Sequence, residues 1–289
     1  MHGKVCLVTG ATNGIGEVTA LELARMGATV VIIGRNEEKA KATISKIKSA
    51  VTNADVSYLI ADLSLMAQVK RVADEFRAKY DRLDVLVNNA GARFDRYIPT
   101  AEGLEMTFAL NHMSYFYLTQ LLLDMLKVSG IPAQKSRVVN VSSSAHQIGK
   151  LNFDDLQSEQ KYSPFRVYGQ SKMMNIVFTN ELSRRLVTQH ANVTANSLHP
   201  GAVRTGFGAD DKSALNFIIG MLRPFFLSPE QGAQTSIYLA SSPEVEGVTG
   251  QYFAKSKPKQ AHKNAYTESA MTQLWIYSED VLKKLEMSL

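Results

Sequence analysis

The sequence predicts an α/β fold in which a doubly wound parallel sheet of about seven strands carries helices on both faces. Short apolar runs alternate with stretches of helical period from Val5 to Phe253, an order typical of parallel sheets. The chain of 289 residues is 45% hydrophobic, which is enough for one sizeable core. Since no linker, repeat or low-complexity tract divides it, we expect a single domain over residues 1–289.

The expected elements follow one another as strand, turn and helix. The first strand, at residues 5–9, leads into a glycine turn and then into a run of helical period that begins at Glu17. The later strands are expected at residues 28–33, 57–60, 84–88, 137–141, 192–198 and 250–253, with a C-terminal extension at 254–289. Ligands of such sheets bind at the carboxyl ends of the strands, so polar residues just after the strands are site candidates.

The turn after the first strand has the glycine content of a phosphate-binding loop. Glycines let the backbone approach a pyrophosphate, whose charge is met by free N–H groups and by the positive end of the helix dipole. The spacing Gly-x-x-x-Gly-x-Gly departs from the commoner GxGxxG, and a merely tight turn is the alternative. The expected cofactor contacts here are Gly10, Thr12, Asn13, Gly14, Ile15 and Gly16.

Tyr168 and Lys172 stand four residues apart, so a helix would place both side chains on one face. A free phenol has a pKa of about 10, and a neighbouring ammonium favours the phenolate. The pair is therefore a candidate proton donor and acceptor, with a solvated helix face as the alternative.

The glycine turn and the YxxxK spacing together resemble the signatures of the short-chain dehydrogenase/reductase family. Further matches follow in the family's order: Asn88-Asn89-Ala90-Gly91, Asn111, Ser143 and the segment from Pro200 to Thr205. The resemblance implies a Rossmann-type fold and hydride transfer between a nicotinamide nucleotide and a carbonyl or alcohol. The long stretch between Ser143 and Tyr168, together with the Trp275 segment, resembles the retinol-dehydrogenase branch of that family.

The resemblance also implies a role for each matched residue. Tyr168 would be the general acid/base, and Lys172 would bind the nicotinamide ribose while lowering the tyrosine pKa. Ser143 would hold the substrate oxygen, with Ser142 and Ser144 as neighbouring candidates. Asn111 would shape the central helix and hold a water of the proton relay, the alternative being a satisfied polar group in a helix. Further implied cofactor contacts are Asp62 (to adenine), Leu63, Asn89, Ala90, Gly91, Pro200, Gly201, Val203 and Thr205.

The end of the second expected strand favours NADP(H) as the cofactor. Arg35 stands where NAD-preferring enzymes usually have a carboxylate, and an arginine can accommodate a 2′-phosphate. Asn36 and Lys39 could add a polar contact and a second positive charge. The alternative is that Arg35 stacks on adenine or points into water, and position 13, basic in some NADP-dependent relatives, is Asn13.

Composition excludes several other classes. The net charge of +5 is scattered, and no basic-aromatic array indicates nucleic acid. Cys6 is the single cysteine, so no intramolecular disulfide forms, and His112, His146 and His199 belong to no metal-ligand motif. The chain enters its first strand at once, and no apolar run approaches about 20 residues. We therefore expect no signal peptide or membrane anchor, no metal, and a cytoplasmic protein.

The segment from Ser213 to Leu227 is apolar, and Gly220 and Pro224 interrupt it, so we expect a substrate lid near residues 206–228. A packed core helix and a membrane-surface contact are the alternatives.

The expected function is NADP(H)-dependent interconversion of an apolar, retinal-like aldehyde or ketone and its alcohol. A light-dependent protochlorophyllide-type C=C reductase and a non-catalytic NADP(H)-sensing binding protein are the alternatives. The sequence leaves peripheral membrane contact and homo-oligomer formation open.

Overall fold

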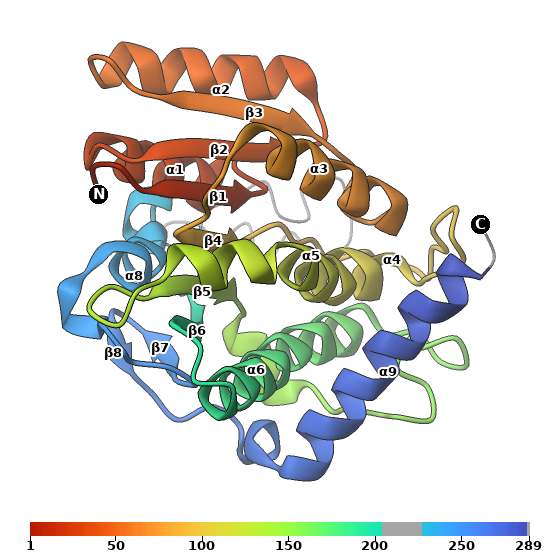
Figure 1. Cartoon of the computed structure of the whole chain (residues 1–289). Coiled ribbons are helices and arrows are strands. Elements are labelled where there is room, and N and C mark those ends of the chain that lie inside the picture. The colour runs from red at the N-terminus through yellow and green to blue at the C-terminus, as the bar shows by residue number, and fades with distance from the viewer. Residues whose placement is uncertain (204–226, 288–289) are drawn as a thin grey trace.

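The computed structural model describes residues 1–203 and 227–287, in which eight strands form one sheet with helices on both faces (Figure 1). The spatial order is β3-β2-β1-β4-β5-β6-β7-β8, and every neighbouring pair is parallel except β7 and β8. The mostly parallel, doubly wound sheet expected from the sequence is confirmed. The strands are β1 (Val5–Thr9), β2 (Thr29–Gly34), β3 (Val56–Ile60), β4 (Val85–Asn88), β5 (Ser136–Val141), β6 (Val193–His199), β7 (Tyr252–Ala254) and β8 (Lys257–Pro258).

Helices cover both faces, which explains why the strands read as nearly continuous apolar runs. On one face pack α1 (Gly14–Arg25), α2 (Glu37–Ala50) and α8 (Pro229–Ser241). On the other pack α3 (Met66–Lys79), α5 (Ser114–Ser129) and α6 (Pro164–Thr188), with α9 (Glu268–Glu286) lying against α6 (Figure 1). Along β1, Leu7 joins the α3/α5/α6 core and Cys6 and Val8 join the α1/α2/α8 core, as the pleat of a strand requires.

Short helical segments lie between the longer elements of the described residues. The helical stretch before α5 consists of α4 (Met106–Phe108) and a π-helical segment, η1 (Ala109–Met113). In the described ranges the 3-10 helices are η2 (Ser144–Ile148), η4 (Pro243–Val245) and η5 (Lys263–Tyr266). The segments η1 and η2 matter for the site, because each contains or borders a residue expected there.

The eighth strand, β8, was not expected. It pairs antiparallel with β7 through a two-residue turn in which Lys255 and Ser256 have φ values of 52° and 57°. Two positive φ values suit a tight hairpin, but glycine or asparagine usually supplies them, so this turn has no sequence signal. The last expected strand, 250–253, is Tyr252–Ala254 in the structure.

The expected lid near 206–228 lies mostly outside the described residues. At its described end, Leu227 forms a parallel bridge with Val203, and Ser228 is the N-cap of α8 in a capping box with Gln231. In the described ranges 1–203 and 227–287, no helix combines the length and apolar character that crossing a bilayer requires.

Candidate active site

Tyr168 and Lys172 lie in the first turns of α6, which begins with Pro164 at a position where a missing N–H is harmless. Lys172 is 3% exposed, and its Nζ donates to the Val141 carbonyl at 3.2 Å. The same Nζ lies 5.7 Å from the ring centroid of Tyr168. The helical spacing read from the sequence thus places the Lys172 amine over one face of the Tyr168 ring.

Ser143 follows β5 and caps η2, where its Oγ accepts the Ala145 N–H at 3.2 Å. Its side chain is also hydrogen-bonded to Tyr168. Neighbouring Ser142 is buried, and its Oγ donates to the Lys172 carbonyl at 2.7 Å, which ties β5 to α6. Of the serines weighed from the sequence, Ser143 therefore meets the tyrosine, whereas Ser142 has a structural contact.

The ionisation of the pair differs from the expectation that lysine lowers the tyrosine pKa. Burial raises the pKa of Tyr168 to about 12, against the opposing effects of the Ser143 hydrogen bond and the positive charge of Arg93. Burial lowers the pKa of Lys172 to about 7. Desolvation disfavours both charged forms here, so near neutral pH the tyrosine holds its proton and the lysine has lost much of its charge.

Asn111 lies in η1 and is fully buried. Its Oδ1 accepts the Ala92 N–H at 2.9 Å, while its Nδ2 donates to the Ala92 carbonyl and to Ser171 Oγ, both at 2.9 Å. The side chain thus joins the segment after β4 to α6 and lies where the helix widens into a π turn. These contacts agree with a part in shaping the helix; a bound water stays a prediction.

The glycine turn connects β1 to α1 with little space around it. A Cβ on Gly10, whose φ is +64°, would lie 2.7 Å from Ala90 Cα, and one on Gly16 would lie 2.5 Å from Asn89 Nδ2. Gly14 begins α1 with φ 56°, and the Asn13 side chain makes no capping bond, so no side chain of the cap covers the first N–H groups of the helix. These features fit a nucleotide pyrophosphate.

A chain of contacts joins this turn to Lys172. Asn89 donates from Nδ2 to the carbonyls of Thr9 and Gly10 at 2.9 and 3.2 Å, bracing the turn. Two residues on, a Cβ on Gly91 would lie 3.0 Å from Lys172 Nζ, so Gly91 packs directly against the amine. Ala90 is buried between the two and donates its N–H to Thr9 Oγ1 at 3.0 Å. The structure therefore brings the glycine turn, the segment after β4 and α6 together.

At the end of β2, Arg35 and Lys39 are exposed, and no carboxylate in the described ranges pairs with the guanidinium of Arg35. Thr12 packs over Gly34, which puts the glycine turn beside this strand end. Asn36 differs from its expected role because its Oδ1 caps α2 by accepting the Lys39 N–H at 2.9 Å. The oxygen of Asn36 therefore has a structural partner already.

Other expected cofactor residues are distributed along the same sheet edge. Asp62 follows β3, and its Oδ1 accepts from the backbone and hydroxyl of Ser64 at 3.0 and 2.7 Å, whereas the Leu63 side chain is buried in the core. After β6, Gly201 has φ +89° and donates its N–H to His199 Nδ1 at 3.0 Å, next to Pro200. Val203 packs over Gly232 of α8, close to Ile15. Thr205 lies outside the described residues.

The sequence did not indicate the backbone carbonyl of Val141, which accepts hydrogen bonds from several side chains of the candidate site. Besides Lys172, it accepts from Asn175 Nδ2 at 3.3 Å and from the hydroxyl of Tyr115 at 3.4 Å, and the Tyr115 ring lies 5.7 Å from Lys172 Nζ. Helical spacing could have indicated both side chains. Asn175 follows Lys172 by three residues and Tyr115 follows Asn111 by four, so each would share a helix face with an expected site residue.

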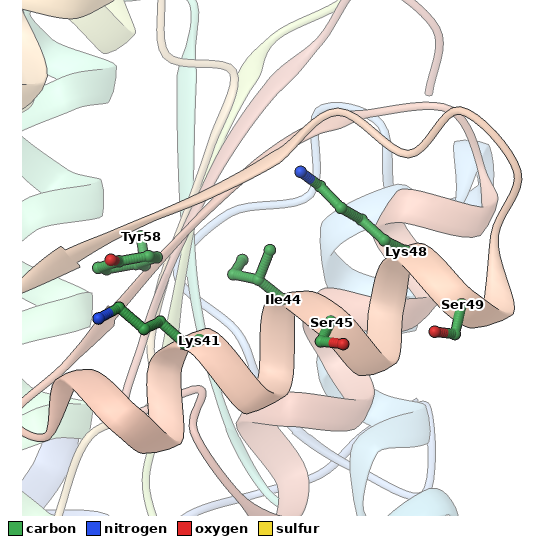
Figure 2. A pocket seen from close by; sticks show the side chains of 6 residues that line it. All are labelled: Lys41, Ile44, Ser45, Lys48, Ser49 and Tyr58. Carbon is green, nitrogen blue, oxygen red and sulfur yellow. The ribbon is translucent and has the colours of Figure 1, made fainter.

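A surface hollow of about 430 Å³ lies between α2 and β3 (Figure 2). Lys41, Ile44 and Tyr58 line it with polar neighbours from α2, and Lys41 is paired with Glu37 at 3.2 Å. It contains none of the expected site residues. In the part of the chain that the structure describes, no group of three His, Cys, Asp or Glu side chains could hold a metal ion.

Comparison with known proteins gives a family match over most of the chain. The short chain dehydrogenase family profile matches residues 4–216. Human retinol dehydrogenase 14 is 42% identical, with 96% of this chain and 86% of that protein aligned. Human polyprenol dehydrogenase is 41% identical, with 99% of this chain and 87% of that protein aligned. Among solved structures, the Pseudomonas aeruginosa RhlG/NADP active-site complex superposes with a TM-score of 0.70 at 30% identity, covering 88% of this chain and 94% of that one.

Proposed function

The chain belongs to the short-chain dehydrogenase/reductase family and to its retinol-dehydrogenase-like branch, and from that premise we propose that it interconverts apolar aldehydes or ketones and their alcohols with NADP(H). One observation carries the proposal. An unbroken series of contacts runs from the glycine turn through Asn89 and Gly91 to Lys172, Tyr168 and Ser143. This arrangement supports a shared site for a nucleotide and a proton donor at the carboxyl edge of one sheet.

The side chains suit proton transfer to a carbonyl oxygen. Tyr168 holds its proton near neutral pH, since burial raises its pKa to about 12. The Oγ of Ser143 accepts the Ala145 N–H, and its own proton is available to Tyr168 or to a substrate oxygen. When bound, a nicotinamide nucleotide supplies or accepts the hydride. Tyr168 then serves as general acid in reduction and general base in oxidation.

The preference for NADP(H) rests on Arg35 at the end of β2. The residue is exposed beside the glycine turn, and no described carboxylate neutralises it. A guanidinium in that place binds a 2′-phosphate by charge-assisted hydrogen bonds. Similar solved structures include both an NADP complex and an NADH complex, so the preference rests on Arg35 alone.

An apolar substrate is supported by the relatives, whose names specify retinol and polyprenol as the alcohols oxidised. The test is turnover of purified protein with NADPH, in the dark, against straight-chain aldehydes of increasing length, retinal and short polar carbonyls. We expect the specificity constant to rise with chain length. Preference for short polar carbonyls would reject the apolar substrate class. Turnover of a pigment only under illumination would favour C=C reduction, and no turnover with intact NADPH binding would favour a sensor.

Arg35→Asp tests the cofactor assignment. We expect NADPH to bind wild type more tightly than NADH, and the variant to lose or reverse this preference because a carboxylate repels the 2′-phosphate. Thermal shifts and dissociation constants for both nucleotides measure it. Arg77→Asp, an equal charge change at an exposed position of α3, is the control and should keep the wild-type ratio of the two dissociation constants. An unchanged ratio in Arg35→Asp would refute the assignment.

A cytoplasmic location is also part of the proposal, and fractionation of cells that produce the full chain tests it.

A further inference from the structure

His146 lies three residues after Ser143 in η2 and is 1% exposed. Its Nδ1 is 2.6 Å from the Ser143 carbonyl oxygen. Its Nε2 receives the backbone N–H of His262 at 3.2 Å and lies 2.9 Å from Gln147 Nε2. Through this one side chain, the segment after β8 touches the turn that carries the candidate substrate-binding serine.

These partners determine the tautomer of the ring. A carbonyl oxygen can only accept, so Nδ1 must carry a proton toward Ser143. A backbone N–H can only donate, so Nε2 must be unprotonated toward His262, and the Gln147 amide can supply a second donor there. A proton on Nε2 would face the His262 N–H, which is itself a donor, so the hydrogen bond between them would be lost. The arrangement therefore requires the neutral Nδ1–H form.

The charges around the ring act in the same direction. Burial lowers the pKa of His146, the bond to Ser143 opposes this, and the nearby His262 and Lys259 lower the pKa further. From β7, the Tyr252 ring packs at 5.0 Å with its hydroxyl 3.5 Å from Nδ1, and His199 of β6 also faces this cluster. None of these groups is an acid that would favour the imidazolium at neutral pH.

The bond from His146 holds the backbone from which the Ser143 hydroxyl projects. The Ser143 carbonyl accepts both the ring N–H and the backbone N–H of His146, the latter at 3.1 Å. With the carbonyl held, Ser143 Oγ keeps its place over the Ala145 N–H and its contact with Tyr168. Loss of the ring bond would leave the Ser143 carbonyl held by one N–H only and would loosen the start of η2, whose Ala145 N–H holds Ser143 Oγ.

We propose that His146 is a positioning residue that holds the substrate-binding hydroxyl of Ser143 toward Tyr168 and couples the C-terminal segment at His262 to the active site. The inference rests on the proposed function, in which Ser143 binds the reacting oxygen. His146 itself does not touch the substrate; it acts through the backbone of Ser143.

Two amide substitutions separate the ends of the imidazole. His146→Asn keeps a donor close to the Nδ1 position, whereas His146→Gln keeps a polar group near Nε2 and loses the donor to Ser143. We expect His146→Ala and His146→Gln to lose roughly tenfold in kcat, the scale of one hydrogen bond, and His146→Asn to restore most of it. The NADPH dissociation constant should stay within about twofold in all three. Equal losses in the Asn and Gln variants would overturn the proposal.

A double-mutant cycle with Ser143→Ala tests whether the effect passes through the hydroxyl. The cycle is informative because the Ser143 carbonyl remains and still accepts from His146. Single-turnover rates with NADPH and an aldehyde should fall in Ser143→Ala, and adding His146→Gln should cause little further loss. A further loss as large as that in the wild-type background would show that His146 acts elsewhere.

Hydrogen exchange gives a readout that does not depend on turnover. The Ala145 amide, which donates to Ser143 Oγ, should be protected in wild type and in His146→Asn and exchange faster in His146→Gln. Unchanged protection in His146→Gln would overturn the positioning role. If wild type reduces no carbonyl, the proposed function fails, while this exchange measurement still decides whether His146 orients Ser143.

Discussion

At the residue scale, burial rather than the neighbouring charge decides the ionisation of Tyr168 and Lys172. In water, an ammonium beside a phenol would favour phenolate. Here the lysine is 3% exposed and has its pKa lowered to about 7, so its charge is itself disfavoured. The pair is therefore poised with the proton on tyrosine, which suits donation to a carbonyl oxygen.

Removal of the Tyr168 hydroxyl tests its role as proton donor. Tyr168→Phe should lose at least about 100-fold in turnover, the scale of a general acid, while it still binds NADPH. Stopped-flow rates and thermal shifts measure the two properties. Tyr238→Phe, which loses an exposed hydroxyl bonded to Glu244, serves as the control and should keep wild-type activity. Near-normal turnover in Tyr168→Phe would reject the mechanism.

The lowered pKa of Lys172 should appear in the stability of the protein. The folded pKa is about 7 and the ordinary pKa of a lysine is 10.5, so between these pH values the unfolded chain binds a proton that the folded chain does not. This contribution to the unfolding free energy rises with pH, by up to about 1.4 kcal/mol per unit.

Lys172→Met removes the titrating group, so the unfolding free energy of wild type minus that of the variant should increase from pH 7 to pH 9.5. Urea denaturation at several pH values provides the comparison, in which groups common to both proteins cancel. A difference between the two proteins that does not change with pH would contradict the lowered pKa of Lys172.

At the element scale, the contact between η2 and α6 determines whether Ser143 and Tyr168 meet. A Cβ on Gly169 would lie 2.7 Å from the Ala145 carbonyl oxygen, and one on Gly149 would clash with the Gly169 carbonyl. Both positions lack a side chain where two backbones approach closely. Gly169, the residue after Tyr168, therefore controls how closely η2 can approach α6.

Gly169→Ala tests this close approach, because helix propensity and overpacking predict opposite changes in stability. In an ordinary helix interior the change would stabilise by about 1 kcal/mol, because alanine has the higher helix propensity. Here we expect a loss of about 1–3 kcal/mol from overpacking, together with reduced kcat, since η2 must move away from Tyr168. Denaturant unfolding and steady-state kinetics measure both. A more stable and fully active variant would show that η2 and α6 can move apart without loss of stability or activity.

At the scale of the whole molecule, the C-terminal extension completes the core and reaches the site. Trp275 of α9 is 5% exposed, with ring centroids 5.1 Å from Phe116 of α5 and 6.0 Å from Phe178 of α6. The guanidinium of Arg185 lies 4.0 Å over the indole. Helix α6, which carries Tyr168 and Lys172, is thus held between the sheet and α9 (Figure 1).

Trp275→Ala should lower the unfolding free energy by about 3–5 kcal/mol, the usual cost of truncating a buried tryptophan. Circular dichroism should follow the transition, because Trp275 is the chain's single tryptophan. The neighbouring Ile276 is 49% exposed, and Ile276→Ala should change stability by no more than about 0.5 kcal/mol. Equal effects of the two substitutions would mean that α9 contributes little to the core.

The sequence by itself determined the sheet, the glycine turn and the spacing of Tyr168 and Lys172, because these depend on local periodicity and on residues close together in the chain. Its strand limits differ from the structure by no more than two residues, and among the described residues only the hairpin strand β8, which has no glycine turn signal, was missed.

The tertiary structure decided what local pattern cannot encode. Burial sets the direction of the pKa shifts of Tyr168 and Lys172, helix capping occupies the Asn36 oxygen, and the His262 N–H, 116 residues away, selects the tautomer of His146. Desolvation and fixed hydrogen-bond partners arise only when distant segments pack together.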